Sequence, residues 1–568
     1  MFSRNHFRIL LPLTILSVCL TGLFEPAETH AADSDEVIVQ KINTYIRQGW
    51  TDNEIKPSSR ASDGEFARRV SLDIVGHIPS YEQLMDFLED TSSDKRAKFV
   101  DSLLADTDYI RNWTNLWANK LVGRANNRNG NRQALERWLR RQIYRNTPYN
   151  KMVFGLVAAE GSVQENGAVA FLANHLNDGA VPATSITARV FLGMQVQCTQ
   201  CHNHPFNKWK QAQFWGMNAF FKGTRRQRGA ERNQFALTDS PSDDVNRFEK
   251  RSGLLQMTYR QFVDGTIARG KENKPRELLA KLITDPEKPY MARAQVNRMW
   301  GHFFGYGFTK PVDDMGPHNP PSHPELLDYL ATQFKEAGYD NKRLIRWITA
   351  SEAYNLTSRQ DGDNEVDNPA AGNTPLFSKM YVKQFSAEQL YDSLLIATSA
   401  DKSNRTSAAA EAQRRTWLRQ FVQTFGTDEN DESTTFNGTI PQALVLMNGS
   451  LIQSAINGGN GGFLRRVLDA PNGDLREKPS EKSTRRRKTT RRRRPSRREL
   501  KKIAEREAKA VPKRIETLFL VALARKPTEK EMEALNDVFQ KTPNQSAVTG
   551  LQDVFWAILN SNEFISNH

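Results

Sequence analysis

Apolar side chains recur at intervals of three and four residues along most of this chain, which is the spacing that places them on one face of an α-helix. Leu135, Leu139 and Ile143 follow this spacing. Strict alternation of apolar and polar residues, the pattern of a half-buried strand, is scarce. The pattern predicts a mainly α fold of two packed helical domains with few short strands.

Local signals predict where several helices begin. Ser80 and Gln83 have the spacing of a capping box, as do Thr528 and Glu531. The segment 322–325 is interpreted in the same way, with Ser322 and Glu325 in the cap of a helix that follows. A further helix, predicted from Thr184, leads the chain to Cys198.

The first 31 residues have the organisation of a secretory signal peptide. A basic start containing Arg4 and Arg8 precedes an apolar run at 9–24, and small residues follow near Ala31. The run is shorter than the roughly 20 residues that a membrane-spanning helix needs, and no later segment is long and apolar enough. The sequence predicts export to the periplasm or the cell surface, with no transmembrane segment after cleavage.

The length of 568 residues predicts more than one domain. A polar and irregular stretch at 224–265 is interpreted as a linker between a first helical domain at 35–223 and a second at 266–568. Three cysteines are present, and Cys19 falls in the predicted signal peptide. A secreted chain of this size without a disulfide framework must be stabilised by packing, so the remaining cysteines are candidates for chemistry.

Most of the positive charge lies in one segment. Residues 482–502 contain thirteen Lys or Arg and one Glu, a net of +12, which leaves +2 of the formal charge of +14 for the rest of the chain. The pattern predicts a disordered basic insertion at about 470–505. Its partners outside the cytoplasm would be anionic lipid or an envelope polymer, and the absence of interleaved aromatic residues does not favour nucleic acid.

The sharpest chemical motif is Cys198-Thr199-Gln200-Cys201-His202. Two thiols at this spacing can bind the two vinyl groups of a haem, and the adjacent imidazole can then ligate the iron. Export agrees with this hypothesis, because haem c is attached outside the cytoplasm. The motif predicts one haem c and electron transfer with a redox partner protein. The apolar residues nearest to the motif, which would line a haem cavity, are Phe191, Phe206, Trp209, Phe214 and Trp215.

Three alternatives for this segment stay open. Zinc or another divalent metal could bind Cys198, Cys201 and His204, with His202 in the same candidate set. The cysteines could instead form a redox dithiol or a simple disulfide. The segment could also pack without any chemistry.

A second polar cluster lies in a proline-rich stretch and contains Asp313, Asp314, His318 and His323. Two carboxylates and two imidazoles could bind a hard metal or perform acid–base chemistry. Because prolines shape a rigid turn here and a helix cap follows, a structural role is preferred. The chain has no P-loop, no dinucleotide fingerprint and no Gly-x-Ser-x-Gly elbow, so no catalytic residue is assigned and enzymatic activity is left open.

The stretch from 66 to 221 resembles the planctomycete cytochrome-like domain, catalogued as domain of unknown function 1549. Residues from about 275 to the end resemble its usual companion, domain of unknown function 1553. The segments that carry the two resemblances are 68–73, 101–104, 191–198, 201–209 and 219–221 for the first, and 296–300, 321–328, 386–392 and 560–568 for the second.

The resemblance implies a secreted protein whose biochemical activity is not established. Asn207 stands where many relatives have Asp, which removes a carboxylate from the candidate metal ligands. The chain has no room for the separate cytochrome c domain of many relatives, so any electron transfer would depend on one haem. The alternative is a metal- or disulfide-clasped protein that binds envelope material or polysaccharide without catalysis.

Overall fold

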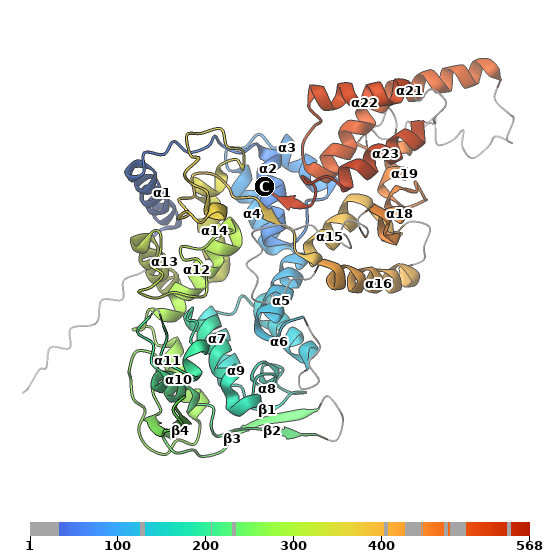
Figure 1. The fold of residues 1–568 in the computed structure, drawn as a ribbon. Coiled ribbons are helices and arrows are strands. Elements are labelled where there is room, and N and C mark those ends of the chain that lie inside the picture. The colour runs from blue at the N-terminus through green and yellow to red at the C-terminus, as the bar shows by residue number, and fades with distance from the viewer. Residues whose placement is uncertain are drawn as a thin grey trace, which may run out of the picture.

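The computed structural model describes residues 33–124, 131–205, 207–229, 234–402, 407–425, 445, 447–470, 475–476, 496–541 and 547–568. The fold is mainly helical with few short strands, which confirms the predicted class (Figure 1). The predicted signal peptide lies outside the described residues.

The first part of the chain is a succession of short helices. Its elements are α1 (Asp35–Asp52), α2 (Asp63–Ile74), α3 (Tyr81–Glu89), α4 (Lys95–Ala105), α5 (Thr107–Val122), α6 (Arg132–Tyr144), α7 (Tyr149–Val157), β1 (Gly161–Ser162), α8 (Val169–Ala173), α9 (Asn177–Thr187), a π-helical turn (Ala188–Leu192), a 3₁₀ turn (Gln197–Gln200) and α10 (Gln211–Asn218). The helix predicted from Thr184 therefore ends at Leu192, before Cys198, because Gly193 adopts a left-handed conformation with a φ of 67°.

The second part continues the helical pattern to the C-terminus. Its elements are α11 (Pro275–Thr284), α12 (Tyr290–Phe304), α13 (Pro324–Glu336), α14 (Asn341–Ala350), 3₁₀ turns at Ala353–Asn355, Pro369–Ala371 and Ala400–Lys402, β6 (Lys383–Gln384), α15 (Ala387–Thr398), α16 (Ser407–Phe425), α18 (Ser450–Ile456), α19 (Phe463–Asp469), α21 (Arg497–Leu523), α22 (Glu529–Lys541), α23 (Ala547–Leu559) and β7 (Ser566–Asn567). In Figure 1, α2 to α4 lie between a group containing α1, α13 and α14 and a lobe containing α18 to α23.

Two of the three predicted helix caps are confirmed. The Ser80 and Gln83 side chains each accept a bond from the other residue's backbone N–H, at 3.2 and 3.0 Å. Thr528 and Glu531 form the same reciprocal pair. The prediction for Ser322 is wrong, because the cap residue of α13 is His323 and no side chain accepts a capping bond there. Pro324 opens that helix and has no N–H to satisfy, so less capping is needed.

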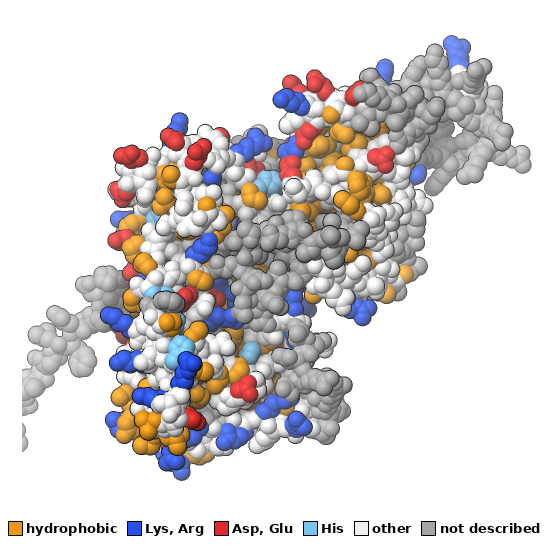
Figure 2. All heavy atoms as spheres, in the orientation of Figure 1, with side chains coloured by type: hydrophobic (Ala, Val, Ile, Leu, Met, Phe, Trp, Pro, Cys, Tyr) orange, Lys and Arg blue, Asp and Glu red, His pale blue; other side chains and the backbone are white. Residues whose placement is uncertain are grey.

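The stretch interpreted as an irregular linker contains four strands, β2 (Thr224–Arg228), β3 (Phe235–Asp239), β4 (Val245–Glu249) and β5 (Leu255–Tyr259). β3 pairs antiparallel with β1 and β2, and β4 pairs with β5. Phe235 and Leu237 alternate with more exposed residues and are buried, a pattern too short to stand out among polar neighbours. On β5, by contrast, Leu255 and Met257 are exposed, and Figure 2 shows hydrophobic side chains gathered over this part of the surface.

Of the predicted basic insertion at about 470–505, the structure describes residues 470, 475–476 and 496–505. Residues 477–495 lie outside the described residues, and α21 already begins at Arg497, so residues 497–505 are helical and not disordered as predicted. After Arg498 the sequence mixes acidic and aliphatic residues with its lysines, a composition that favours a helix. Within the described ranges, no helix combines the length and the apolar character needed to cross a membrane.

Buried polar residues of α2 bind the end of the chain. The Arg68 guanidinium donates to the carbonyl oxygens of Ala522 and Phe564, at 2.8 and 2.7 Å. The buried Asp73 carboxylate accepts bonds from Lys383 at 2.6 Å, and from Tyr354 and Asn567 at 2.8 Å. These contacts place the C-terminus beside α2, in the middle of the molecule (Figure 1).

Candidate functional site

The Cys-x-x-Cys-His segment forms a 3₁₀ turn that rests on α10. The Thr199 side chain is buried, and its hydroxyl donates to the Val196 carbonyl at 2.6 Å. The carbonyl of Gln200 accepts two bonds of 3.1 Å, from the Gln211 amide and from the Trp215 indole N–H. The turn is thus anchored from below by α10, while its outer side faces solvent.

Both cysteines of the turn are free thiols and both are exposed. In a 3₁₀ helix, side chains three positions apart eclipse one another. Cys198 lies within the turn and Cys201 follows directly after it. The two exposed thiols lie three positions apart, one within the turn and one at its end, so they are candidates to bind one cofactor or one ion or to form a disulfide.

The hydrogen bonding of His202 defines which ring nitrogen is available. Its Nδ1 lies 2.6 Å from the carbonyl oxygen of Asn203. A carbonyl oxygen only accepts, so Nδ1 carries the proton and the neutral ring has its lone pair on Nε2. His202 is exposed, so Nε2 can reach a ligand. This is the arrangement that metal-binding imidazoles commonly have, with the second nitrogen bonded to a backbone carbonyl.

The turn adjoins part of the second polar cluster, which the sequence had left separate. The ring of His204 is 5.9 Å from the ring of His318, and His318 Nε2 is 3.2 Å from an Asp314 carboxylate oxygen. The Met315 N–H donates to the carbonyl of Gly193 at 2.7 Å. Even so, no group of three or more His, Cys, Asp or Glu residues within the described ranges is placed so that it could hold a metal ion.

The remaining members of the second cluster point elsewhere. Asp313 is buried between two cationic side chains. His323 is 7% exposed and packs against the rings of Phe308 and Phe377, with Nδ1 2.9 Å from the Ser322 hydroxyl. The four residues that the sequence grouped together therefore occupy three different environments.

The buried imidazole of His323 should make the folded protein less stable in acid. Burial lowers its pKa from 6.5 to about 4. Between pH 6.5 and pH 4, His323 binds a proton in the unfolded chain but not in the folded chain. The contribution of His323 to the free energy of unfolding is therefore complete above pH 6.5 and is lost as the pH falls toward 4. The shift corresponds to about 3 kcal/mol. Denaturant unfolding at pH 7 and pH 4.5 should show the loss, and His323→Leu should reduce it.

His202→Gln is the matched control for this experiment, because an exposed histidine should leave the acid sensitivity of the protein unchanged. Some sensitivity should also survive in His323→Leu, since burial lowers the pKa values of His175 and His302 as well. Equal pH dependence in His323→Leu and the parent protein would contradict the prediction.

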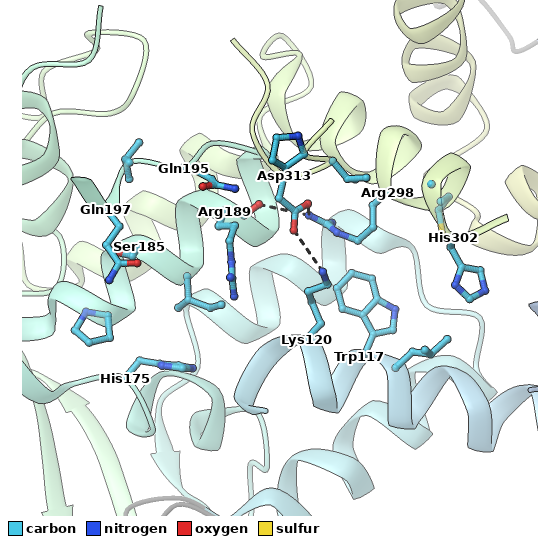
Figure 3. Close-up of a pocket in the computed structure, with 18 of the residues that line it drawn as sticks. Trp117, Lys120, His175, Ser185, Arg189, Gln195, Gln197, Arg298, His302 and Asp313 are labelled. Atoms are coloured by element: carbon cyan, nitrogen blue, oxygen red, sulfur yellow. Dashed lines mark hydrogen bonds and ion pairs between the residues drawn. The ribbon is translucent and has the colours of Figure 1, made fainter. Parts of the chain in front are cut away.

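A cavity of about 870 Å³ lies between the two parts of the chain and reaches the residues directly before Cys198 (Figure 3). It is bounded by α5, by α9 with the π-helical turn, by α12 and by the loop that contains Asp313. The residues that line it are Trp113, Leu116, Trp117, Lys120, His175, Pro182, Ser185, Ile186, Arg189, Gln195, Val196, Gln197, Arg298, Met299, Gly301, His302, Gly305, Pro311, Val312 and Asp313.

The apolar residues expected to line a haem cavity are not among these. Phe191 and Phe214 are buried in the hydrophobic core, and Trp209 and Trp215 pack against that core. Phe206 lies outside the described residues. The four described rings therefore belong to the core packing, and the indole rings that line the cavity are Trp113 and Trp117 of α5.

Charged side chains converge on one end of the cavity. Asp313 is 2.7 Å from Arg298 and 3.4 Å from Lys120 (Figure 3). Burial opposes ionisation of Asp313, but the charges of Arg298 and Lys120 outweigh it and hold the pKa of the carboxyl below its ordinary value. Burial lowers the pKa of Lys120, and the charges of Arg298 and Arg189 lower it further. The sequence did not predict a shared site for Lys120, Arg189 and Arg298, because no pattern in it links three cations so far apart.

The fold and the site define a mainly helical protein with an exposed free-thiol turn beside a charged cavity. Residues 41–226 match the family model described as Protein of unknown function (DUF1549), and residues 275–539 match the model described as Protein of unknown function (DUF1553). The chain belongs to the family in which these two domains follow one another, as its sequence predicts. No curated protein and no solved structure matches it significantly.

Proposed function

We propose that this is an exported protein that holds one haem c at Cys198, Cys201 and His202 and exchanges electrons with a redox partner protein. The observation that carries the proposal is the 3₁₀ turn, with two free and exposed thiols three positions apart and an imidazole directly after them. Export belongs to the proposal, because this attachment takes place outside the cytoplasm.

Each residue of the turn has a defined part in the proposal. Cys198 and Cys201 would form the two thioether bonds, and His202 would offer Nε2 to the iron while its Nδ1–H stays bonded to Asn203. A bound haem supplies an iron that accepts and releases one electron. The bonds from α10 to the Gln200 carbonyl anchor the backbone between the two cysteines, which supports the proposal.

The test is expression of the full chain together with haem c maturation machinery in a bacterial periplasm. We expect one covalent haem per chain, seen by haem staining of a denaturing gel, by the pyridine haemochrome spectrum and by intact mass. The Cys198→Ala/Cys201→Ala variant should lose the covalent haem completely. His202→Gln should keep a thioether-bound haem but change its absorption spectrum, because the axial ligand is lost.

His204→Gln is the matched control, since it removes the neighbouring imidazole without touching the proposed ligand. Its haem content and spectrum should equal those of the parent protein. A colourless protein with one zinc ion per chain would contradict the proposal and favour a metal clasp. A colourless and metal-free protein without titratable thiols would instead show a disulfide.

A further inference from the structure

The cavity between the two parts of the chain has the size and lining of a ligand site, and the proposed haem attachment does not use it. Its volume of about 870 Å³ falls in the range of small-molecule sites, roughly 300–1,000 Å³. Neither cysteine nor His202 belongs to its lining. Leu116, Trp117 and other apolar side chains form walls that can bury the carbon skeleton of an organic molecule.

The charges at one end of the cavity indicate the sign of the ligand. Lys120 and Arg298 share the single carboxylate of Asp313. Arg189 also lines the cavity, and its positive charge acts on Lys120, Asp313 and His175, lowering the pKa of each. Figure 3 shows the Arg189 and Lys120 side chains pointing into the same space. Among the described residues, the lining thus has three cationic side chains and one carboxylate, which favours an anion.

The polar groups of the lining suggest how such an anion would be recognised. Guanidinium groups bind carboxylate, sulfate and phosphate through paired N–H donors, and an ammonium group adds a point charge. Ser185, Gln195 and Gln197 lie on the opposite side of the cavity and can bond to hydroxyl or carbonyl groups of the same molecule (Figure 3). The Nε2 of His175 donates to the Leu121 carbonyl at 2.8 Å, which leaves Nδ1 as an acceptor.

We infer that the cavity binds a small organic molecule with an oxyanion group, which Lys120, Arg189 and Arg298 meet while the tryptophan-containing wall covers the rest of the molecule. The two parts of the chain supply different halves of this site, α5 and the π-helical turn from the first and α12 with Asp313 from the second. A ligand would therefore link the two family domains.

The inference can be tested with three acids and their neutral counterparts: glucuronate with glucose, benzoate with benzamide, and phenyl phosphate with phenol. Binding to the full chain is measured by isothermal titration calorimetry and by tryptophan fluorescence. We expect at least one acid to bind ten times more tightly than its counterpart, and the preferred pair identifies the oxyanion and the skeleton. The Cys198→Ala/Cys201→Ala variant should bind equally well, which separates this result from the haem proposal.

Arg189→Gln and Lys120→Met should each weaken binding of the preferred acid at least tenfold. Arg465→Gln, which removes an exposed cation on α19, should leave the affinity unchanged. A second measurement needs no variant: acetylation of lysines, followed by peptide mass spectrometry, should show Lys120 protected by the bound acid. The inference would be overturned if none of the three acids bound more tightly than its neutral counterpart. It would also be overturned if Lys120 stayed open to acetylation while an acid was bound.

Discussion

Replacing Asp73 with alanine should lower the free energy of unfolding by about 3–5 kcal/mol. The carboxylate is buried and accepts bonds from Lys383, Tyr354 and Asn567. Without it, the Lys383 ammonium is left buried and uncompensated, and its pKa is already lowered by burial. The change also removes a link between α2 and the last residues of the chain. Urea unfolding followed by tryptophan fluorescence measures the loss.

Two variants define the origin of this effect. Asp73→Ala combined with Lys383→Met should recover part of the stability, because no buried charge is then left without a partner. Asp469→Ala breaks an exposed ion pair with Arg465 on α19 and should change the unfolding free energy by less than about 1 kcal/mol. If Asp73→Ala is as mild as Asp469→Ala, the cluster around Asp73 does not stabilise the fold as described.

Trp300→Ala should lower the free energy of unfolding by about 3–5 kcal/mol, through loss of a fully buried indole ring in the second part of the chain. Trp300 is fully buried on α12 and stacks on Phe304 and Phe308, with ring centroids 4.5 and 4.6 Å apart. Phe377 meets it edge-on at 5.4 Å. Truncation to alanine would leave a cavity that rigid aromatic neighbours cannot fill. Urea unfolding gives the magnitude, and the near-ultraviolet circular dichroism reports the loss of ring packing.

Trp300→Phe is the informative companion to this variant. The indole Nε1 is buried without a hydrogen-bond partner among the described residues, so phenylalanine removes an unsatisfied donor as well as some volume. We expect Trp300→Phe to be clearly milder than Trp300→Ala. If Trp300→Phe lowers the free energy of unfolding as much as Trp300→Ala does, the packing of an aromatic ring at this position contributes little, which would contradict the prediction.

The helical class and the caps at Ser80 and Thr528 follow from the sequence, because each depends on residues within one or two turns of each other. The spacing of the two thiols is equally local, since both lie in one short segment. The short strands of 224–265 were missed although they pair with near neighbours in the sequence. β2 is almost entirely polar, and the apolar residues of β5 are exposed, so these short strands lack the alternation that would mark a half-buried strand.

The charged cavity was decided by the tertiary structure alone. Lys120, Arg189 and Arg298 belong to helical segments that are far apart in the chain, and no pattern in the sequence indicates that they meet. The approach of His204 to His318 depends in the same way on contacts between the two domains. Helical periodicity states which face of a segment is buried, but it does not state which other segment covers that face. Packing of distant helices therefore set the site, and the sequence set the elements that build it.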